Sequence, residues 1–157
     1  MDILYKSRLK TFLGMITLVF REQGLQQVLF EKDSKDREYS RKELLPESIY
    51  AKQLSAYFRG ERLEFDFPLD ISGTTFQKRV WKVVRSIPFG QTISYRDIAR
   101  KINFPDAQRA VGNALRQNPI PIVIPCHRVI RSNGELGGFV AGIEVKRKLL
   151  EFERLNK

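Results

Sequence analysis

The stretch DAQRAVGNALRQNPIPIVIPCHRV, residues 106–129, decides the fold that we expect for the second half of this 157-residue chain. Its first part has the pattern of a helix, which we place at residues 106–117. An apolar run flanked by prolines follows at residues 120–124, and short apolar runs of this kind are typical of buried strands. The stretch therefore predicts a helix and then a buried strand that leads directly to Cys126 and His127.

Two further helices are expected upstream, each preceded by a hydroxyl side chain that can cap it. They are a helix from Thr74 or Thr75 to about Arg85, and a short helix at residues 95–101 behind Ser94. The short helix, a connection at residues 102–105 and the helix at 106–117 have the outline of a helix-turn-helix. Because many small helical domains share this outline, it does not by itself identify a DNA-binding protein.

The helix at 106–117 is unusually rich in small residues, namely Ala107, Ala110, Gly112 and Ala114. A glycine inside a helix costs ~1 kcal/mol relative to alanine, so we expect a compensating use. Small residues permit close approach either to DNA or to a neighbouring helix. Arg109 and Arg116 bracket the small face that these residues are expected to form, and they could contact phosphate or enter the duplex, whereas helix packing with solvated arginines is the alternative.

The first half of the chain is expected to be an antiparallel sheet followed by a helix. Runs of β-forming residues, broken at Gly14 and Gly24, occupy residues 3–9, 14–20 and 25–30. The other expected features are a charged surface loop at 31–42, a helix at 47–58 with Ile49, Leu54, Tyr57 and Phe58 on its apolar side, and an extended linker at about 61–72. The fold class is therefore α+β: a supporting N-terminal α/β domain, residues 1–70, and a mostly helical winged helix-turn-helix domain, residues 73–157.

Charge is distributed unequally between the two halves. Residues 1–70 hold 12 basic and 12 acidic side chains, whereas residues 71–157 hold 16 basic and 6 acidic side chains and so carry the whole net charge of +10. A basic half of this kind indicates a polyanionic partner, and nucleic acid is the candidate that we favour over mere solubility.

Composition excludes several classes of protein. One cysteine rules out an internal disulfide, and one cysteine with one histidine rules out a Cys/His zinc site, which needs about four such ligands. The sequence contains no run of ~18 apolar residues that could span a membrane. The apolar segment at 11–20 follows three basic residues but precedes no small-residue cleavage site, so we interpret it as a strand. With its lone cysteine, the protein is expected to be cytoplasmic.

The adjacent pair Cys126 and His127 is the candidate for chemistry. A thiolate is a strong nucleophile, but a free thiol has a pKa near ~8.5, so a base must promote its deprotonation. His127 is a candidate base, directly or through a water, and Glu153 is a candidate to orient the imidazole. The alternatives are a buried structural cysteine beside an unrelated histidine, and a Cys–His hydrolase, whose two residues usually come from separate parts of the chain.

These motifs resemble one known family. IPCHRV, with upstream FGQTISYRDIA and RAVGNALRQNPIPI and downstream GELGGF and VKRKLL, is similar to the O6-alkylguanine-DNA alkyltransferases, also called methylated-DNA–protein-cysteine methyltransferases. The resemblance covers about residues 76–153. It implies DNA repair by direct damage reversal: after base flipping, the alkyl group of O6-alkylguanine passes irreversibly to a cysteine, in one step and without a cofactor. Because water does not readily cleave the resulting thioether and the chain has no second cysteine to accept the group, we expect a single turnover per molecule.

The resemblance also implies roles for individual residues. Cys126 would be the alkyl acceptor, His127 its base through a water, Glu153 the residue that holds His127, and Asn118 the brace of the cysteine turn. Tyr95 would donate a proton or hydrogen bond to the departing guanine, and Arg128 would tie the cysteine turn to the helices. Arg109 would fill the space left by the flipped base, and contacts with the minor groove would come from Ala110, Gly112 and Arg116. The base pocket would be lined by Val129, Phe139, Val140 and Ala141.

The sequence departs from the family at residues 140–142, where Val-Ala-Gly stands in place of a small polar residue and two glycines. Because the extra bulk would narrow the base pocket, we expect methyl groups to be accepted better than benzyl groups. Some family members bind zinc in the N-terminal half, but this chain has no cysteine or histidine there. The expected partner is double-stranded DNA carrying O6-alkylguanine, bound by a monomer away from any membrane. The alternative is a non-catalytic lesion-sensing relative, in which another residue replaces the cysteine.

Overall fold

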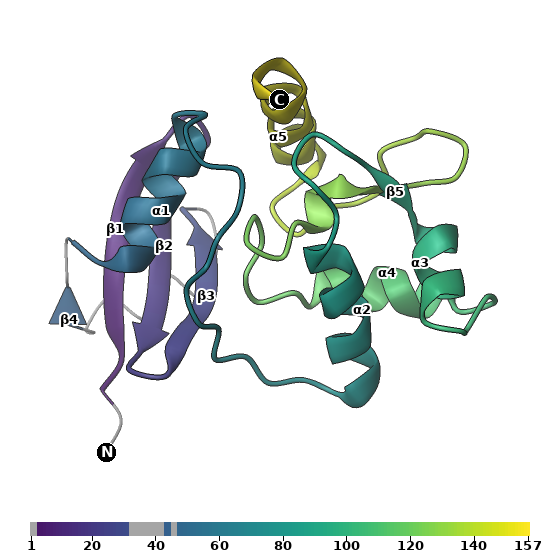
Figure 1. The fold of residues 1–157 in the computed structure, drawn as a ribbon, viewed down its shortest axis with the longest axis horizontal. Helices are drawn as coiled ribbons and strands as arrows, with labels where there is room; N and C mark the ends of the chain where they lie inside the picture. Colours follow the sequence, from purple (N-terminus) through teal and green to yellow (C-terminus); the bar gives the residue numbers. More distant parts are fainter. Residues whose placement is uncertain (1–2, 32–42, 45–46) are drawn as a thin grey trace. The chain divides into compact units, whose positions relative to one another are not determined.

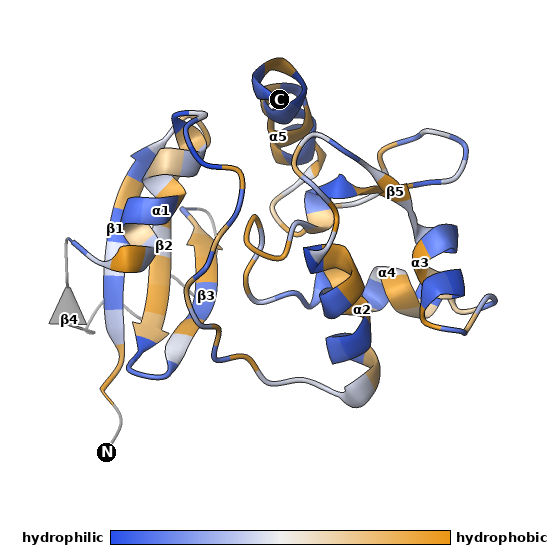
Figure 2. Ribbon diagram, in the orientation of Figure 1, coloured by the Kyte–Doolittle hydropathy of each residue, from blue (hydrophilic) through white to orange (hydrophobic). Residues whose placement is uncertain are grey.

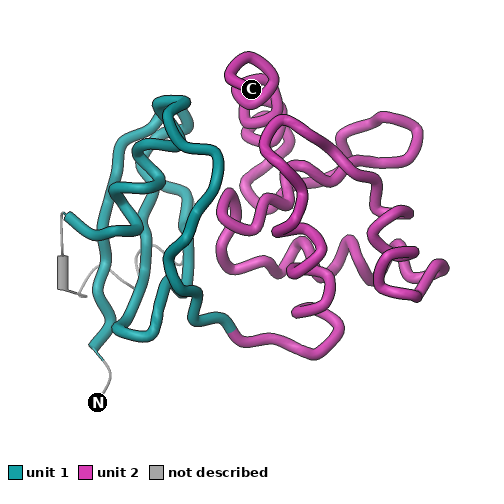
Figure 3. The backbone as a smooth tube through the Cα atoms, in the orientation of Figure 1, with its two compact units in different colours: residues 1–71 teal, residues 72–157 magenta. Residues whose placement is uncertain are grey.

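The computed structural model describes residues 3–31, 43–44 and 47–157, and its contacts divide the chain into two compact units, residues 1–71 and 72–157 (Figure 3). Among the described residues, no helix is long and apolar enough to cross a membrane. Each unit has its own core.

Unit 1 contains a four-stranded sheet and a helix (Figure 1). Its elements are β1 (Tyr5–Thr11), β2 (Gly14–Arg21), β3 (Gly24–Phe30), β4 (Glu43–Leu44) and α1 (Ile49–Phe58). The sheet order is β3-β2-β1-β4, with β2 antiparallel to both neighbours and β4 parallel to β1. Buried residues follow one another along the centre of β2, which is apolar over most of its length (Figure 2).

The predicted meander of three strands is confirmed, but unit 1 differs from prediction in three details. The sequence analysis missed β4, and most of the loop expected at 31–42 lies outside the described residues. The helix begins at Ile49 because Ser48 caps it, and Ile49 is 52% exposed rather than on the apolar side. Within the expected linker, Phe67 is buried and Leu69 pairs with Leu25 at the edge of the sheet.

Unit 2 is mostly helical and contains a helix-turn-helix, α3 and α4. Its elements are α2 (Thr75–Arg85), β5 (Ile93–Ser94), α3 (Tyr95–Lys101), α4 (Gln108–Arg116), the short 3₁₀ turn η2 (Cys126–Arg128), β6 (Val129–Ile130) and α5 (Ile143–Asn156). Asn103 follows α3 with φ +66°, a left-handed conformation that asparagine tolerates at the end of a helix. The amide of Phe104 then donates to the Ala99 carbonyl at 2.9 Å, which closes the turn.

The predicted start of α2 is confirmed, and the cause is a reciprocal cap. The Thr74 hydroxyl accepts from the Gln77 amide at 3.0 Å, while the Gln77 side chain accepts from the Thr74 amide at 2.9 Å. One side of α2 is apolar, and its Trp81 indole donates to the Ala114 carbonyl of α4 at 2.9 Å. This bond and the surrounding core fix the position of α4.

Two predictions for residues 106–124 are wrong. The run at 120–124 is buried as expected, but it forms a tight turn rather than a strand, and Ile122 adopts φ +78°. The small residues of α4 do not share one face, because Ala114 is only 2% exposed and packs in the core whereas Ala110 is exposed. The outer face of α4 carries instead Arg109, Asn113 and Arg116.

Candidate functional site

The turn that carries Cys126 is held by one side chain, Asn118. Its Nδ2 donates to the Ile124 carbonyl at 2.8 Å and to Cys126 Sγ at 3.2 Å, and its Oδ1 accepts from the Ile120 amide at 2.9 Å. These side-chain bonds take the place of the backbone hydrogen bonds that a strand would make with a neighbouring strand. They hold the turn in which Ile122 adopts a left-handed backbone conformation, which costs a β-branched residue ~1–3 kcal/mol. Asn118 therefore lies where a brace for the cysteine turn is predicted.

A buried carboxylate joins the turn to α5. Glu153 Oε2 accepts from His127 Nε2 at 2.6 Å and from Arg128 Nη2 at 2.9 Å, while Oε1 accepts from Arg128 Nε at 2.8 Å and from the Gly90 amide at 3.1 Å. Burial alone would raise the pKa of Glu153, but the hydrogen bonds and charges of His127 and Arg128 outweigh it and hold the pKa well below its ordinary value. Arg128 also donates to the Ile87 carbonyl at 2.7 Å, so it ties the cysteine turn both to α5 and to the segment that follows α2.

His127 is arranged as a neutral base. Because Glu153 is ionised, Nε2 carries the proton that this carboxylate accepts, and Nδ1 is left as the basic nitrogen. Burial lowers the pKa of His127 despite the opposing effect of Glu153, so the imidazole is neutral and can accept a proton. Within the described part of the chain, Nδ1 is buried and has no hydrogen-bond partner.

Cys126 is a thiol at rest. Its side chain is 5% exposed, and burial raises its pKa to about 11, even though the Asn118 amide and the charge of Lys146 favour the thiolate. The proton must therefore leave during the reaction. His127, the next residue, is the neutral base nearest in the chain.

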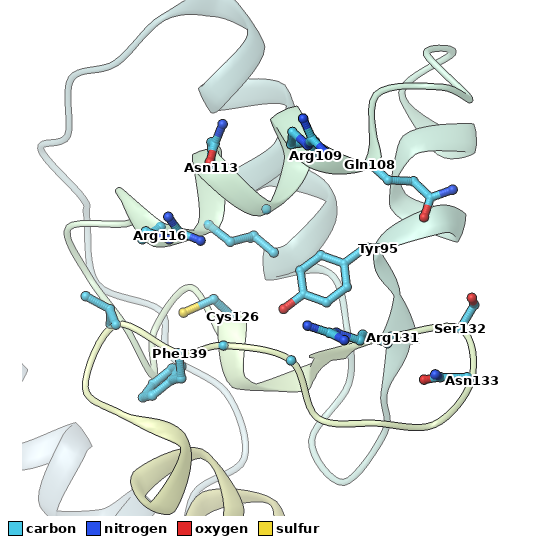
Figure 4. A pocket seen from close by; sticks show the side chains of 15 residues that line it. Tyr95, Gln108, Arg109, Asn113, Arg116, Cys126, Arg131, Ser132, Asn133 and Phe139 are labelled. Carbon is cyan, nitrogen blue, oxygen red and sulfur yellow. The ribbon is translucent and has the colours of Figure 1, made fainter.

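The sulfur opens into a cavity of about 730 Å³ between α4 and residues 131–140 (Figure 4). Arg109, Gly112 and Arg116 line it from α4, and Arg131 lines it from the other side. None of the described residues that line it is acidic. The cysteine thus faces a positively charged cavity beside the second helix of the helix-turn-helix.

Tyr95 projects into this cavity from the start of α3 and is positioned by a glycine. A Cβ atom on Gly137, which has φ +73°, would lie 2.7 Å from the Tyr95 hydroxyl oxygen. Burial raises the pKa of Tyr95, and the charge of a Cys126 thiolate adds to the rise, so the phenol keeps its proton and can donate it. Phe139, also in the lining, meets the His127 ring edge-on at 6.3 Å between centroids.

Two predicted pocket residues do not line the cavity. Val129 is fully buried, and Ala141 is not among the lining residues. Ala110, predicted to contact the minor groove, is exposed on α4. Val140 does line the cavity, although it is 45% exposed. Of the two bulky departures from the family pattern, only Val140 can therefore affect what enters.

The sequence analysis missed Lys146. This fully buried ammonium donates to the Val129 carbonyl at 2.6 Å and to the Gly138 carbonyl at 3.1 Å, so it links the strand after the cysteine turn to the cavity wall. Burial lowers its pKa to about 8, against the opposing effect of Cys126. A signal existed in the sequence, because Lys146 shares one face of α5 with Leu149 and Glu153, three and seven residues on.

Family models match both units. The model of the 6-O-methylguanine DNA methyltransferase DNA-binding domain matches residues 75–155, and that of the ribonuclease-like domain of the same proteins matches residues 4–71. The chain belongs to the 6-O-methylguanine DNA methyltransferase family. The resemblance inferred from residues 76–153 is confirmed, and the family membership extends over the first half as well.

Relatives within this methyltransferase family match this chain over about two thirds to nearly all of its length. A methylated-DNA–protein-cysteine methyltransferase of Methanosarcina acetivorans is 42% identical over 96% of this chain and 98% of its own length. One from Mycobacterium bovis is 56% identical over 65% of this chain and 62% of its own. The crystal structure of Mycobacterium tuberculosis O6-methylguanine methyltransferase superposes with a TM-score of 0.89 at 39% identity, covering 99% of this chain and 95% of that one. A structure of the M. tuberculosis protein in complex with DNA superposes equally well, at 41% identity over 97% of this chain and 94% of that one.

Proposed function

We propose that this protein repairs DNA by moving the alkyl group of O6-alkylguanine onto Cys126, once per molecule. The observation that carries the proposal is the placement of the only cysteine. It opens into a basic cavity beside α4 and is followed by a neutral histidine that Glu153 holds in one tautomer. The names of the relatives, methylated-DNA–protein-cysteine methyltransferases, support the same activity.

The reaction balances without a cofactor. His127 Nδ1 takes the thiol proton, directly or through a water, and the sulfur attacks the alkyl carbon as the bond from that carbon to O6 breaks. The electron pair of the broken bond remains on the guanine, which gains a proton with Tyr95 as donor, and His127 returns its proton to restore the phenol. The net products are guanine and an S-alkylcysteine, a thioether that water does not readily cleave.

Base flipping is the step that admits the substrate. The O6 atom lies inside the duplex, so the nucleotide must leave the stack at a cost of a few kcal/mol, which is smaller for a lesion that pairs poorly. The cavity beside α4 supports this route because it leads from the outer face of that helix to the sulfur. Arg109, exposed on α4 at the cavity, is the residue that we assign to the space left by the extruded base.

The decisive experiment is intact mass spectrometry after mixing the protein with duplex DNA that contains O6-methylguanine. We expect a gain of one methyl group per molecule, mapped to the peptide that holds Cys126, and at most one lesion repaired per protein with DNA in excess. Repeated turnover, or a methyl group on another residue, would overturn the proposal. The Cys126→Ala variant should transfer no methyl group but should still bind DNA. If the protein were a non-catalytic lesion sensor, the wild type would also transfer no methyl group.

Arg109→Ala tests the flipping step separately from the chemistry. We expect transfer from duplex DNA to slow more than transfer from free O6-methylguanine base, because the free base needs no flipping. Arg147→Ala is the matched control, since Arg147 is exposed on α5 and does not line the cavity. Equal slowing with both substrates would contradict the role of Arg109.

We also propose that methyl groups are transferred faster than benzyl groups. Val140 supports this preference because it adds bulk at the cavity wall. Val140→Ser should then raise the rate with O6-benzylguanine more than the rate with O6-methylguanine. Equal rates of methyl and benzyl transfer in the wild type would contradict the preference.

A further inference from the structure

A third arginine lines the cavity, on the side opposite α4. Arg131 follows β6 directly, and its guanidinium points into the space below Tyr95 (Figure 4). Its charge acts inside the cavity, because it opposes the rise that burial causes in the pKa of Tyr95 and adds to the fall that burial causes in the pKa of Lys146. The proposed reaction gives Arg131 no role.

The present partner of Arg131 is weakly held. Its Nη1 lies 3.3 Å from Glu135 Oε2, and the two side chains are 61% and 65% exposed. Exposed ion pairs contribute little to stability and exchange readily for a better partner. The loop between them does not depend on this pair, because the Arg131 amide donates to the Glu135 carbonyl at 2.8 Å and the Gly134 amide donates to the Arg131 carbonyl at 3.0 Å.

We propose that Arg131 binds a backbone phosphate of the DNA strand that carries the extruded nucleotide, and that Glu135 is its partner only in the absence of DNA. The proposal rests on the function proposed above. A nucleotide whose base lies against Cys126 leaves its sugar and phosphates at the rim of the cavity. Arg109 and Arg116 reach that rim from α4, and Arg131 is the cation on the opposite wall.

Arginine suits this role because its planar guanidinium can bind a phosphate through two hydrogen bonds. Ser132, the next residue in the chain, also lines the cavity and has a hydroxyl that can donate. The extruded nucleotide would thus be held between α4 and the loop at 131–135. Glu135 competes with the phosphate for Arg131, so removing the Glu135 charge should strengthen DNA binding. If the Arg131–Glu135 pair served only to support the loop, removing that charge would instead weaken DNA binding.

The test compares four variants in a Cys126→Ala background, so that binding to O6-methylguanine duplex can be measured without reaction. The variants are Arg131→Ala, Arg131→Lys, Glu135→Gln and the control Arg147→Ala, which removes an exposed, ion-paired arginine outside the cavity. Binding is measured at several salt concentrations. Loss of one phosphate contact should reduce the magnitude of the salt slope by about 1 and weaken binding on the order of fivefold.

We expect this loss for R131A, recovery of most of the slope for R131K, and tighter binding for E135Q. With Cys126 intact, R131A should slow transfer from duplex DNA more than transfer from the free base. A slope for R131A equal to that of R147A, or weaker binding by E135Q, would overturn the proposal. Failure of the wild type to take up a methyl group would instead refute the proposed function, because the salt slopes are read from binding alone.

Discussion

The proton on Cys126 gives the sharpest test of the site. Burial raises the pKa of this thiol to about 11, whereas a free thiol has a pKa of ~8.5. A free thiol would therefore hold at least about a hundredfold more thiolate at any pH well below ~8.5. Because only the thiolate attacks an alkylating reagent, the resting protein should react with iodoacetamide about a hundredfold more slowly than an exposed cysteine, before any effect of access is counted.

The assay follows the mass of the protein during reaction with iodoacetamide from about pH 6 to about pH 9.5. The chain has one cysteine, so a single added group reports on Cys126 alone. The rate should rise about tenfold per pH unit with no plateau, because the whole range lies below the pKa. Circular dichroism at each pH confirms that the fold is intact.

Asn118→Ala supplies the complementary change. Its amide donates to Sγ at 3.2 Å and favours the thiolate, so its removal should slow the reaction with iodoacetamide further in any variant that remains folded. A rate that levels off below about pH 8.5 in the wild type would show that the thiolate is already formed at rest. That result would refute the conclusion that His127 must remove the proton during transfer.

Three further predictions concern stability and packing. Glu153→Gln should lower the free energy of unfolding in urea by about 3–5 kcal/mol, because it leaves a buried arginine unpaired, whereas the exposed Glu151→Gln should not change it. In a Cys126→Ala background, which removes the opposite pH dependence of the buried thiol, the protein should gain stability in denaturant as the pH rises through about 8, because folded Lys146 then releases a proton that the unfolded chain still holds. Lys146→Met in the same background should lose this gain and about 1–3 kcal/mol, as two buried carbonyls lose their donor. Gly137→Ala should slow alkyl transfer and destabilise the fold by about 1–3 kcal/mol, and an unchanged rate and melting temperature would show that Tyr95 has room to move.

Local signals in the sequence predicted the elements whose causes are local. The reciprocal cap of Thr74 and Gln77 lies within four residues, so α2 was placed correctly from sequence alone. The turn before Cys126 was predicted as a strand, because an apolar run has the same sequence pattern in a buried strand and in a buried tight turn. The difference lies in Asn118, whose side chain bonds to the backbone at two points along the run.

The errors in the site have the same origin. Lys146 resembles the solvated lysines around it, and its burial depends on the carbonyls of Val129 and Gly138, which only the folded chain brings together. Val129 follows the cysteine closely in sequence, but it points into the core because β6 pairs with β5. Adjacency in sequence singled out Cys126 and His127, but it did not indicate which of their neighbours face the cavity.

The position of Glu153 in α5 has a consequence for synthesis of the protein. The ribosome adds the cysteine turn before the helix that carries this carboxylate, so the growing chain exposes an unsupported thiol and imidazole until α5 emerges and packs. A newly made molecule can therefore become competent only after its last helix has docked. Premature termination between residues 128 and 153 would yield a chain that still contains Cys126 and His127 but lacks the carboxylate that holds the imidazole.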